Sequence, residues 1–518
     1  MTRCSYQHTL GFMISICLSW IGFAQAAPLG PTSLEGLGMV RSWTAQTVAA
    51  RGEGMEMNMH LSNSRFTHVF DVVTADGVRS FVEGTLGPQG QVMTKEEAER
   101  QADIAMRMLK LEGIEASVKS RQIPELTILV QSPTGRVEAI DAETGRIKWQ
   151  LAVGEPDLPG AVPTANENYT ASLSGSTLYV TEIATGKLVA KHFTRNIPGG
   201  SPTLTESHAL VPLYRGAMEA VPLDPELAKA GSTFLSSFGS PTARPTLVGD
   251  ILCWPTDRGA VYFADGARAT DLFRVRTRDR IVGQVAYAAP HSFFVGTEDG
   301  YLICIDDKRE SIVWDYLMGT PAAGTPYVLG DMVFVVTTDG MLHGVDAKLG
   351  VERWTRRGVR RTAGGIGNRL ICEMFDGTLA ALDVANGEAL ARVPMPRGAK
   401  IIDNAITDRL YLAEGGRISC YRDADEPWPT IYFSVVKDKA YHSGADGEDE
   451  PDTTEETAEA SMGAESAADN PFATDSPADG EDPFGGDSGA DDDPFGESGS
   501  GDDDPFGGDS GADEDPFG

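Results

Sequence analysis

Residues 135–149 read GRVEAIDAETGRIKW, and close copies of this stretch recur along the chain. The segments 300–314, 340–354 and 377–391 read GYLICIDDKRESIVW, GMLHGVDAKLGVERW and GTLAALDVANGEALA. Each begins with a turn glycine, continues as an alternating strand to an aspartate, and turns into a second strand that often ends in tryptophan. Recurrence of this kind predicts a fold that repeats one supersecondary unit.

Weaker copies fill the gaps between these four segments. The leading glycines of all copies lie 37 to 43 residues apart, at Gly135, Gly175, Gly216, Gly259, Gly300, Gly340, Gly377 and Gly416. A period near forty residues is that of a four-stranded propeller blade. The sequence therefore predicts an all-β fold, an eight-bladed β-propeller. Seven blades and a cap are the alternative, because the eighth copy ends near Asp425 without a clear outer strand.

The residues of the repeat have structural roles. Asp-Gly pairs supply the positive φ angles that tight hairpins need. The aspartate six residues after the glycine is expected to bind backbone amides of the next turn; it occurs at Asp141, Asp265, Asp306, Asp346 and Asp383. The tryptophans at the end of the copy are expected to pack between neighbouring blades; they are Trp149, Trp314 and Trp354.

The frame Ala-x-Asp-x-x-Thr-Gly-x-x-x-Trp of residues 139–149 resembles the PQQ-like β-propeller repeat. The resemblance covers roughly residues 117–425 and is most specific in the first, fifth, sixth and seventh copies. Families with this repeat include quinone (PQQ)-dependent dehydrogenases. They also include the cofactor-free BamB-like propellers of the outer-membrane β-barrel assembly machinery, which the chain matches better in length.

The start of the chain resembles an export signal. Arg3 precedes an apolar run from Thr9 to Phe23, and Ala24-Gln25-Ala26 fits the cleavage rule. Residues 1–26 are therefore predicted to be a signal peptide that sends the protein to the periplasm or cell envelope. The alternative is an uncleaved anchor. No later stretch is long and apolar enough to predict a membrane span.

An amino-terminal segment, residues 27–116, precedes the predicted propeller of residues 117–436. Residues 27 to about 60 are rich in glycine and polar residues and are expected to be poorly ordered. Residues 66–73 and 78–86 are predicted to form a hairpin, and the capping box that begins at Thr94 predicts a helix to about Leu111. This α+β segment is expected to cover one face or edge or to supply the strand that closes the ring. Residues 430–436 are the other candidate for that strand.

Residues 437–518 form an acidic tail predicted to be disordered. From Ser443 onward it holds 26 Asp and Glu and no Lys or Arg, which leaves about −7 of the net charge of −33 for the rest. This charge balance argues against nucleic acid as a partner. The tail repeats DPFG, and its Pro-Phe units are candidate contacts for a protein partner, with a solubilising spacer as the alternative. Their phenylalanines are Phe472, Phe484, Phe495, Phe506 and Phe517.

One dense basic cluster is a second candidate partner-binding site. It lies between the sixth and seventh copies and consists of Arg353, Arg356, Arg357, Arg360 and Arg361. Such a cluster suits an acidic segment, of a partner or of this chain's own tail. An ordinary solvated loop is the alternative.

No catalytic, cofactor-binding or metal-binding motif stands out. The quinone dehydrogenases of the resembling family carry adjacent cysteines, whereas Cys253, Cys304, Cys372 and Cys420 are far apart. Each lies in an apolar run and is interpreted as a small buried hydrophobe rather than half of a disulfide. The sequence therefore predicts a protein that is not an enzyme and needs no cofactor.

We expect a protein-interaction scaffold of the cell envelope that acts in outer-membrane protein assembly. The alternatives are a quinone-dependent dehydrogenase-like enzyme and an extracytoplasmic binding module whose tail tethers a partner.

Overall fold

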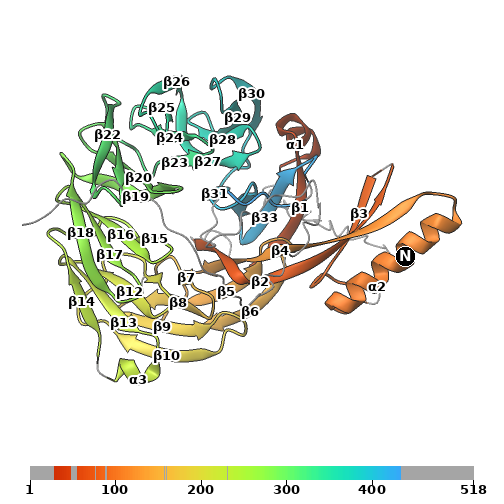
Figure 1. The fold of residues 1–518 in the computed structure, drawn as a ribbon, viewed down its shortest axis with the longest axis horizontal. Helices are drawn as coiled ribbons and strands as arrows, with labels where there is room; N and C mark the ends of the chain where they lie inside the picture. Colours follow the sequence, from red (N-terminus) through yellow and green to blue (C-terminus); the bar gives the residue numbers. More distant parts are fainter. Residues whose placement is uncertain are drawn as a thin grey trace, which may run out of the picture. The chain divides into compact units, whose positions relative to one another are not determined.

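The computed structural model describes residues 29–47, 55–75, 77–87, 90–156, 158, 160–229, 231–426 and 428–432. In this part of the chain the strands form eight antiparallel sheets that follow one another around a ring (Figure 1). Each sheet is one blade, so the predicted all-β, eight-bladed propeller is confirmed. The predicted signal peptide and acidic tail lie outside the described residues.

In blades 2 to 7 the four strands of each sheet are consecutive in sequence and run from the inside of the ring to its outside. Blade 2 holds β7 (Thr164–Ala165), β8 (Tyr169–Ser174), β9 (Thr177–Glu182) and β10 (Leu188–Phe193). Blade 3 holds β11 (Thr203–Leu204), β12 (His208–Leu213), β13 (Ala217–Pro222) and β14 (Thr233–Ser236), with the short helix α3 (Pro225–Ala228) before β14. Blade 4 holds β15 (Thr246–Val248), β16 (Ile251–Thr256), β17 (Ala260–Asp265) and β18 (Thr270–Arg276).

The next three blades repeat this arrangement. Blade 5 holds β19 (Ile281–Ala288), β20 (Ser292–Thr297), β21 (Tyr301–Asp306) and β22 (Ser311–Leu317). Blade 6 holds β23 (Tyr327–Leu329), β24 (Met332–Val336), β25 (Met341–Asp346) and β26 (Glu352–Arg357). Blade 7 holds β27 (Val359–Ile366), β28 (Arg369–Met374), β29 (Thr378–Asp383) and β30 (Ala389–Pro394).

The leading glycine of every copy lies in the hairpin between the second and third strands of its blade. All eight have positive φ, for example +80° at Gly340. A Cβ at Gly340 would come within 2.5 Å of the Phe375 ring, so both the backbone angle and the close neighbour exclude a larger residue. The spacing of these glycines is therefore the spacing of the blades.

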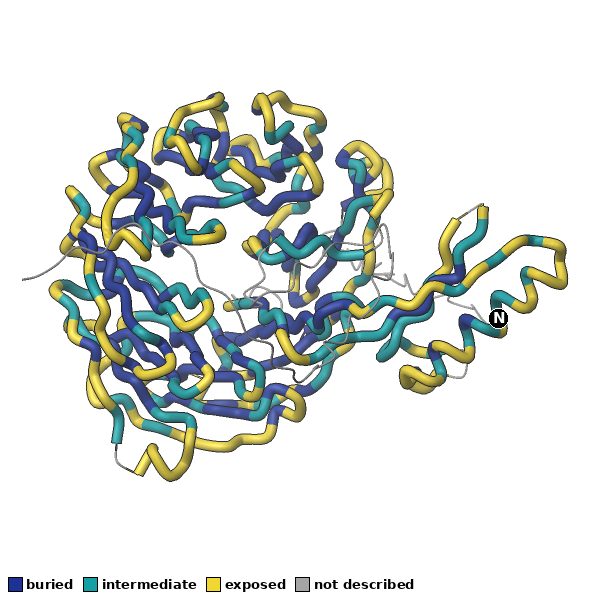
Figure 2. The backbone as a smooth tube through the Cα atoms, in the orientation of Figure 1, coloured by how far each residue is buried: buried dark blue, intermediate teal, exposed yellow. Residues whose placement is uncertain are grey.

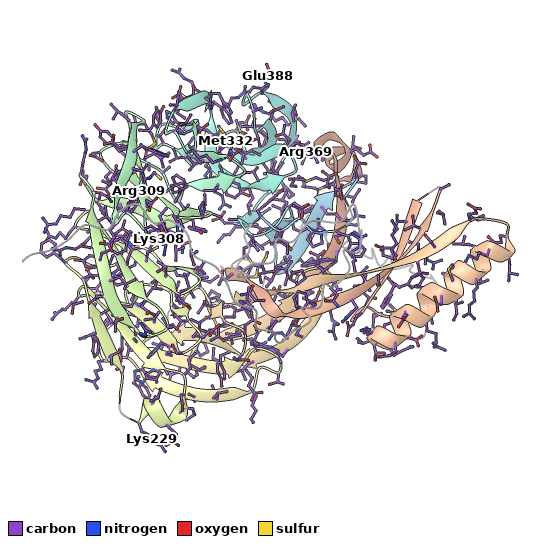
Figure 3. The ribbon with its side chains drawn as sticks, in the orientation of Figure 1. Lys229, Lys308, Arg309, Met332, Arg369 and Glu388 are labelled. Carbon is purple, nitrogen blue, oxygen red and sulfur yellow. The ribbon has the colours of Figure 1, made fainter. Side chains whose placement is uncertain are left out.

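The aspartates of the repeat bind the turn to the outer strand, as predicted. In blade 6 the Oδ1 atom of Asp346 accepts hydrogen bonds from the amides of Lys348 (3.0 Å) and Leu349 (2.9 Å). In blade 5 Asp306 accepts in the same way from Lys308 and Arg309, which are labelled in Figure 3. The aspartates thus stabilise the turns that lead to the outer strands.

The tryptophans pack between blades, which confirms the second structural prediction. The indole N–H of Trp354 in blade 6 donates to the Val384 carbonyl of blade 7 at 2.9 Å. The same bond joins Trp149 to Ile183 at 2.6 Å and Trp314 to Ala347 at 3.2 Å. Each tryptophan therefore joins its own blade to the next one.

The core lies between the blades. The second and third strands of each blade are buried along most of their length, whereas an outer strand such as β10 is exposed at five of its six residues (Figure 2). Inner strands are covered by both neighbouring blades, which explains why they read as nearly continuous apolar runs. Outer strands have one solvent-facing side, so apolar and polar residues alternate along them instead.

Blade 8 combines the two ends of the described chain. Its inner strands are β31 (Lys400–Ile402), β32 (Leu410–Glu414) and β33 (Arg417–Asp423), and its outer strand is β1 (Met39–Gln46). The amino-terminal segment therefore supplies the closing strand. The other candidate, residues 430–436, does not take this position: Ile431 makes an isolated bridge with Thr407, and residues 433–436 lie outside the described part.

The expectation of poor order from residue 27 to 60 is wrong where the structure describes these residues. The helix α1 (Pro31–Leu37) precedes β1, and its Leu34 and Leu37 are buried against blades 7 and 8. Arg369, labelled in Figure 3, donates to the Leu37 carbonyl at 2.7 Å and pairs with Asp423. Strands of the ring thus occur well before residue 117, the predicted start of the propeller, because β1 finds its partner at the opposite end of the chain.

Blade 1 extends beyond the ring. It consists of β2 (Glu56–Thr74), β4 (Ala116–Gln131), β5 (Arg136–Asp141) and β6 (Ile147–Ala152), and β3 (Gly77–Val82) pairs with the far half of β2. The helix α2 (Lys95–Leu111) packs Ala98 and Ala102 on this extension, and the Thr94 hydroxyl caps it by accepting from the Glu97 amide. The predicted hairpin and helix are therefore present. We call β3, α2 and residues 66–74 and 116–124 the arm (Figure 1).

Candidate protein-docking face

One face of the ring carries two sets of loops. Because strands alternate in direction, the hairpins with the leading glycines share a face with the connections from each outer strand to the next blade. We call this side the hairpin face. It bears four large apolar side chains from blades 2 to 4 that are 66–74% exposed, which we call the apolar patch: Phe193, Ile197, Tyr214 and Phe238.

Backbone hydrogen bonds hold the three loops of the apolar patch together. The Tyr214 amide donates to the Ile197 carbonyl at 3.0 Å, and the Gly199 amide donates to the Pro212 carbonyl at 2.8 Å. The Ser240 hydroxyl donates to the Tyr214 carbonyl at 2.5 Å. Loops joined in this way lose little conformational freedom when a partner binds.

A buried carboxylate fixes the loop that carries Phe193. Glu219 on β13 is fully buried, and it accepts from the Arg195 amide at 3.0 Å and from the Ser232 hydroxyl at 2.7 Å. The His192 ring nitrogen Nε2 lies 2.9 Å from the same carboxylate. The apolar patch thus stands on a satisfied buried polar network rather than on a loose loop.

Positive charges lie beside the aromatic rings of this region. The Arg258 guanidinium is 5.8 Å from the Phe238 ring centre, and the Arg195 guanidinium is 5.6 Å from that of Phe234. Aromatic residues together with arginine are the composition of protein-interface hot spots. The arrangement is suited to docking a protein surface.

The arginines of the predicted basic cluster lie on β26 of blade 6 and at the start of β27 of blade 7. Three of its arginines are bound to acidic residues of this chain. Arg353 pairs with Asp346 at 2.7 Å, and this contact, together with the turn amides, lowers the pKa of the Asp346 carboxyl. Arg360 and Arg361 share the buried Glu373 at 3.1 and 2.9 Å.

The other two members of the cluster, Arg356 and Arg357, have no ion-pair partner in the described part of the chain. The cluster is therefore less positive than its sequence indicates, and its role in binding stays a prediction. The five phenylalanines of the tail lie outside the described residues, so their role stays a prediction as well.

The four cysteines of the propeller are buried and free. Burial raises the pKa of the Cys304 thiol to about 12 and shifts that of the other three in the same direction. These thiols are thus unreactive, which agrees with their interpretation as buried hydrophobes. Within the described residues no group of three His, Cys, Asp or Glu side chains is placed to hold a metal ion, and none of the helices is long and apolar enough to cross a membrane.

The apolar patch was not predicted from the sequence, although the sequence contains a signal for it. Tyr214 stands two residues before the leading Gly216, in a hairpin position where polar residues are usual. Phe193 and Phe238 likewise lie where an outer strand ends and a connection begins. Large apolar side chains at turn positions indicate a binding surface, but which of them lie side by side depends on contacts between blades.

Comparisons with known proteins match parts of this chain to other proteins. The sequence family described as outer membrane protein assembly factor BamB matches residues 257–422. The outer membrane protein assembly factor BamB of Shewanella oneidensis is 27% identical over 135 residues, 23% of this chain. The match spans only 34% of that protein's length.

Two solved structures are also similar. The crystal structure of BamB from Moraxella catarrhalis has a TM-score of 0.49 and 15% identity, and the match covers 58% of this chain and 92% of that one. The computationally designed Ika8 protein has a TM-score of 0.46 and 13% identity, with 57% and 93% of the two chains covered.

Proposed function

Because this chain is a β-propeller of BamB-like PQQ repeats, we propose that it is a non-catalytic protein-docking scaffold of the cell envelope that acts in outer-membrane protein assembly. The observation that carries the proposal is the apolar patch on the hairpin face. Exposed apolar side chains gathered on loops that are already held in place mark a protein-interaction site.

Three further features support this proposal. The name of the Shewanella relative assigns outer-membrane protein assembly to that protein, although the match covers about a third of its length. The export-like residues 1–26 are consistent with an envelope location. Arg356 and Arg357, without ion-pair partners in the described part of the chain, offer a second contact for an acidic partner.

Affinity purification from an envelope extract tests the proposal. The tagged full-length protein is compared with the Phe193→Asp/Tyr214→Asp/Phe238→Asp variant and with Leu349→Asp as a matched control. Leu349 is also a highly exposed apolar residue, 64% exposed, but it lies in the turn between β25 and β26, on the opposite face. We expect the wild type and the Leu349 variant to recover outer-membrane assembly proteins and the triple variant to lose them.

Two results would overturn the proposal. One is recovery of the same partners by the triple variant. The other is a quinone absorbance band in the purified protein, because a bound redox cofactor would indicate an enzyme rather than a scaffold.

A further inference from the structure

The arm has a free sheet edge along β3. Within the described residues β3 pairs with β2 alone, so one side of this strand has no neighbouring strand (Figure 1). The Glu83 amide, just after β3, donates to the His68 carbonyl of β2 at 3.0 Å. Because main-chain groups alternate in direction along a strand, the amide and carbonyl groups of Val78 and Ser80 point away from β2. They face the free side of the arm.

This edge lacks the features that blunt the outer edges of the blades. The outer strands of seven blades shift register against their neighbours, and the outer strand of blade 3, β14, has only four residues. Bulges and short strands are devices that prevent pairing at an edge. β3 pairs with β2 over six residues without a shift. Its one charged side chain, Arg79, lies over the Phe81 ring, 5.2 Å from the ring centre. The edge of β3 is therefore open to a further strand.

The helix α2 carries exposed apolar side chains beside this edge. Ala98 and Ala102 face the sheet and are buried. Ile104, Met108 and Leu111 follow one another at spacings of four and three residues, so they share a different face of the helix. They are 43%, 59% and 89% exposed. We call these three residues the arm stripe.

The arm stripe lies on the flank of α2 that is turned toward β3. On the other flank, Lys95 and Glu99 line a hollow together with Gln122 of β4. Ile104 and Met108 follow these two residues by nine positions, which is about two and a half turns, and so lie on the opposite flank. Because β2 lies between β3 and β4, the flank away from β4 is the β3 side. A strand added to the edge of β3 would thus lie beside the arm stripe.

The edge selects an extended strand as its occupant, because only another strand satisfies main-chain groups that alternate in this way. A second copy of this chain fits less well. β3 runs toward the ring and α2 runs away from it, and the arm stripe occupies only the distal half of α2. Two arms paired through β3 by a two-fold axis would place each arm stripe beside the polar Glu97 and Gln101 of the other copy. A segment of a different protein has no such mismatch.

We propose that the edge of β3 and the arm stripe together bind an extended segment of a partner protein by β-strand addition. Main-chain hydrogen bonds to Val78 and Ser80 hold the segment in place. Its side chains on the helix side are apolar, since they pack against Ile104 and Met108. Residues between them point to the opposite face of the sheet, so the segment alternates in polarity. The inference goes beyond the proposed function, because this site lies on blade 1 and the apolar patch lies on blades 2 to 4.

Hydrogen–deuterium exchange and fluorescence anisotropy test this inference on the full-length protein. The probe is the labelled peptide GSTVTVTVTSG, which alternates as proposed, and its control is GSTVTPTVTSG. We expect the probe to slow exchange about tenfold in residues 78–82 and to leave exchange unchanged in β22, an outer strand with a register shift. The control should bind about tenfold more weakly, because proline lacks one ladder donor and does not fit within a pair of strands.

Two variants at one position test the edge. Ser80→Pro and Ser80→Ala both remove the hydroxyl that donates to Asp71. Only proline also removes the outward amide, and its ring stands on the free side, where an edge strand tolerates it. We expect Ser80→Pro to weaken binding of the probe about tenfold and Ser80→Ala to leave it unchanged.

Variants on α2 test the arm stripe. Ile104→Gln/Met108→Gln removes apolar surface on the β3 flank and keeps good helix formers. Arg107→Gln/Lys110→Gln is the matched control, since both residues are exposed on the same helix but turned away from β3. We expect the first pair to weaken binding about fivefold and the control pair to leave it unchanged.

The inference is wrong if the probe leaves exchange in β3 unchanged or slows it equally in β22. It is also wrong if Ser80→Pro binds the probe like Ser80→Ala, or if the two glutamine pairs bind it equally. Sedimentation velocity tests the second copy: a wild-type dimer that Ser80→Pro converts to a monomer would contradict a partner strand. The Phe193→Asp/Tyr214→Asp/Phe238→Asp variant is expected to bind the probe like the wild type. A failure of this site and a failure of the apolar patch would thus be told apart.

Discussion

Trp354 shows at the scale of one residue how the blades are held together. Its ring is 8% exposed and lies against Gly387 of the next blade, where an added Cβ would approach within 2.4 Å of the ring. It also contacts Phe334, with ring centres 5.6 Å apart. A single side chain thus combines apolar burial, a ring contact and a hydrogen bond to blade 7.

Trp354→Ala is expected to lower the free energy of unfolding by about 3–5 kcal/mol, as large-to-small changes in a core do. The replacement removes the packing and leaves the Val384 carbonyl without its donor. Urea unfolding followed by circular dichroism measures the change. Trp354→Phe is the control and should cost less, because it keeps most of the volume. A loss below about 1 kcal/mol for the alanine variant would contradict the contact between blades.

His60 gives a second prediction at this scale. Burial lowers the pKa of its ring from 6.5 to about 4, an effect that Arg65 and Lys148 reinforce and that Glu167 and Glu125 oppose. Between these two values the unfolded chain binds a proton that the folded protein does not. Stability is therefore expected to fall as the pH falls from about 6.5 to 4.

The shift in the pKa of His60 sets the size of this change in stability: it corresponds to at most about 3 kcal/mol in the free energy of unfolding. The measurement is the free energy of unfolding by urea at several pH values in this window, for the wild type and for His60→Gln. The variant lacks the titrating ring and should show a flatter profile. Identical profiles would mean that His60 is protonated equally in both states.

Residues of the repeat could be predicted from the sequence because their contacts are local. Asp346 binds amides two and three residues away, and Gly340 sets the angle of its own turn. Trp43 could not be predicted in the same way. It donates to the Ala142 carbonyl of blade 1 at 2.9 Å and so acts as the inter-blade tryptophan of blade 8. Its role depends on the pairing of β1 with a strand near the other end of the chain.

At the scale of elements, one carboxylate of blade 2 binds the irregular part of β2 from which the arm begins. β2 changes register with β4 between Leu61 and Phe66, and Glu167 of blade 2 binds the intervening residues. It accepts from the Ser62 hydroxyl at 2.7 Å, the Asn63 amide at 2.6 Å and the Ser64 hydroxyl at 2.5 Å. Although burial acts in the opposite direction, these bonds lower the pKa of the Glu167 carboxyl.

Glu167→Ala is therefore expected to loosen the arm without opening the ring. Loss of several bonds to one charged acceptor should cost about 2–3 kcal/mol locally. Hydrogen–deuterium exchange should become faster in residues 62–74 and 116–124 and stay unchanged in β28 and β29. Glu182→Ala is the control, since the Glu182 side chain bonds to Thr185 in its own turn. Equal exchange in the wild type and the Glu167 variant would contradict this anchoring role.

The elements of the arm were partly predictable for a similar reason. The capping box and the apolar spacing of α2 lie within one short stretch, so the helix could be predicted closely. The length of β2 and β4 could not, because nineteen and sixteen residues of strand are stabilised by each other and by blade 2 rather than by their own composition.

At the scale of the whole molecule, the ring is closed by a tryptophan contact like those that join blades 1 and 2, 5 and 6, and 6 and 7. β1 pairs with β33 from Met39 to Gln46, so one blade is built from both ends of the described chain. Closure in this way removes the edge that an open last blade would leave. It also brings Trp43 onto Gly145 of blade 1, where an added Cβ would lie 2.5 Å from the ring.

Removal of the closing strand should therefore destabilise the entire propeller. A chain that begins at Met55 lacks α1 and β1, which leaves β33 with an unpaired edge and exposes the cluster around Leu410 and Tyr421. We expect its melting temperature to fall by more than about 10 °C relative to a chain that begins at Leu29. Trp43→Ala provides a milder variant for the case in which this truncation does not fold, and it is expected to lower the melting temperature by a few degrees. A synthetic peptide of residues 29–47 added to the truncated protein should restore much of the loss, since binding to the folded state alone stabilises it. If the truncated chain melts like the longer one, or if the peptide has no effect on a folded truncated chain, then β1 does not hold the ring closed.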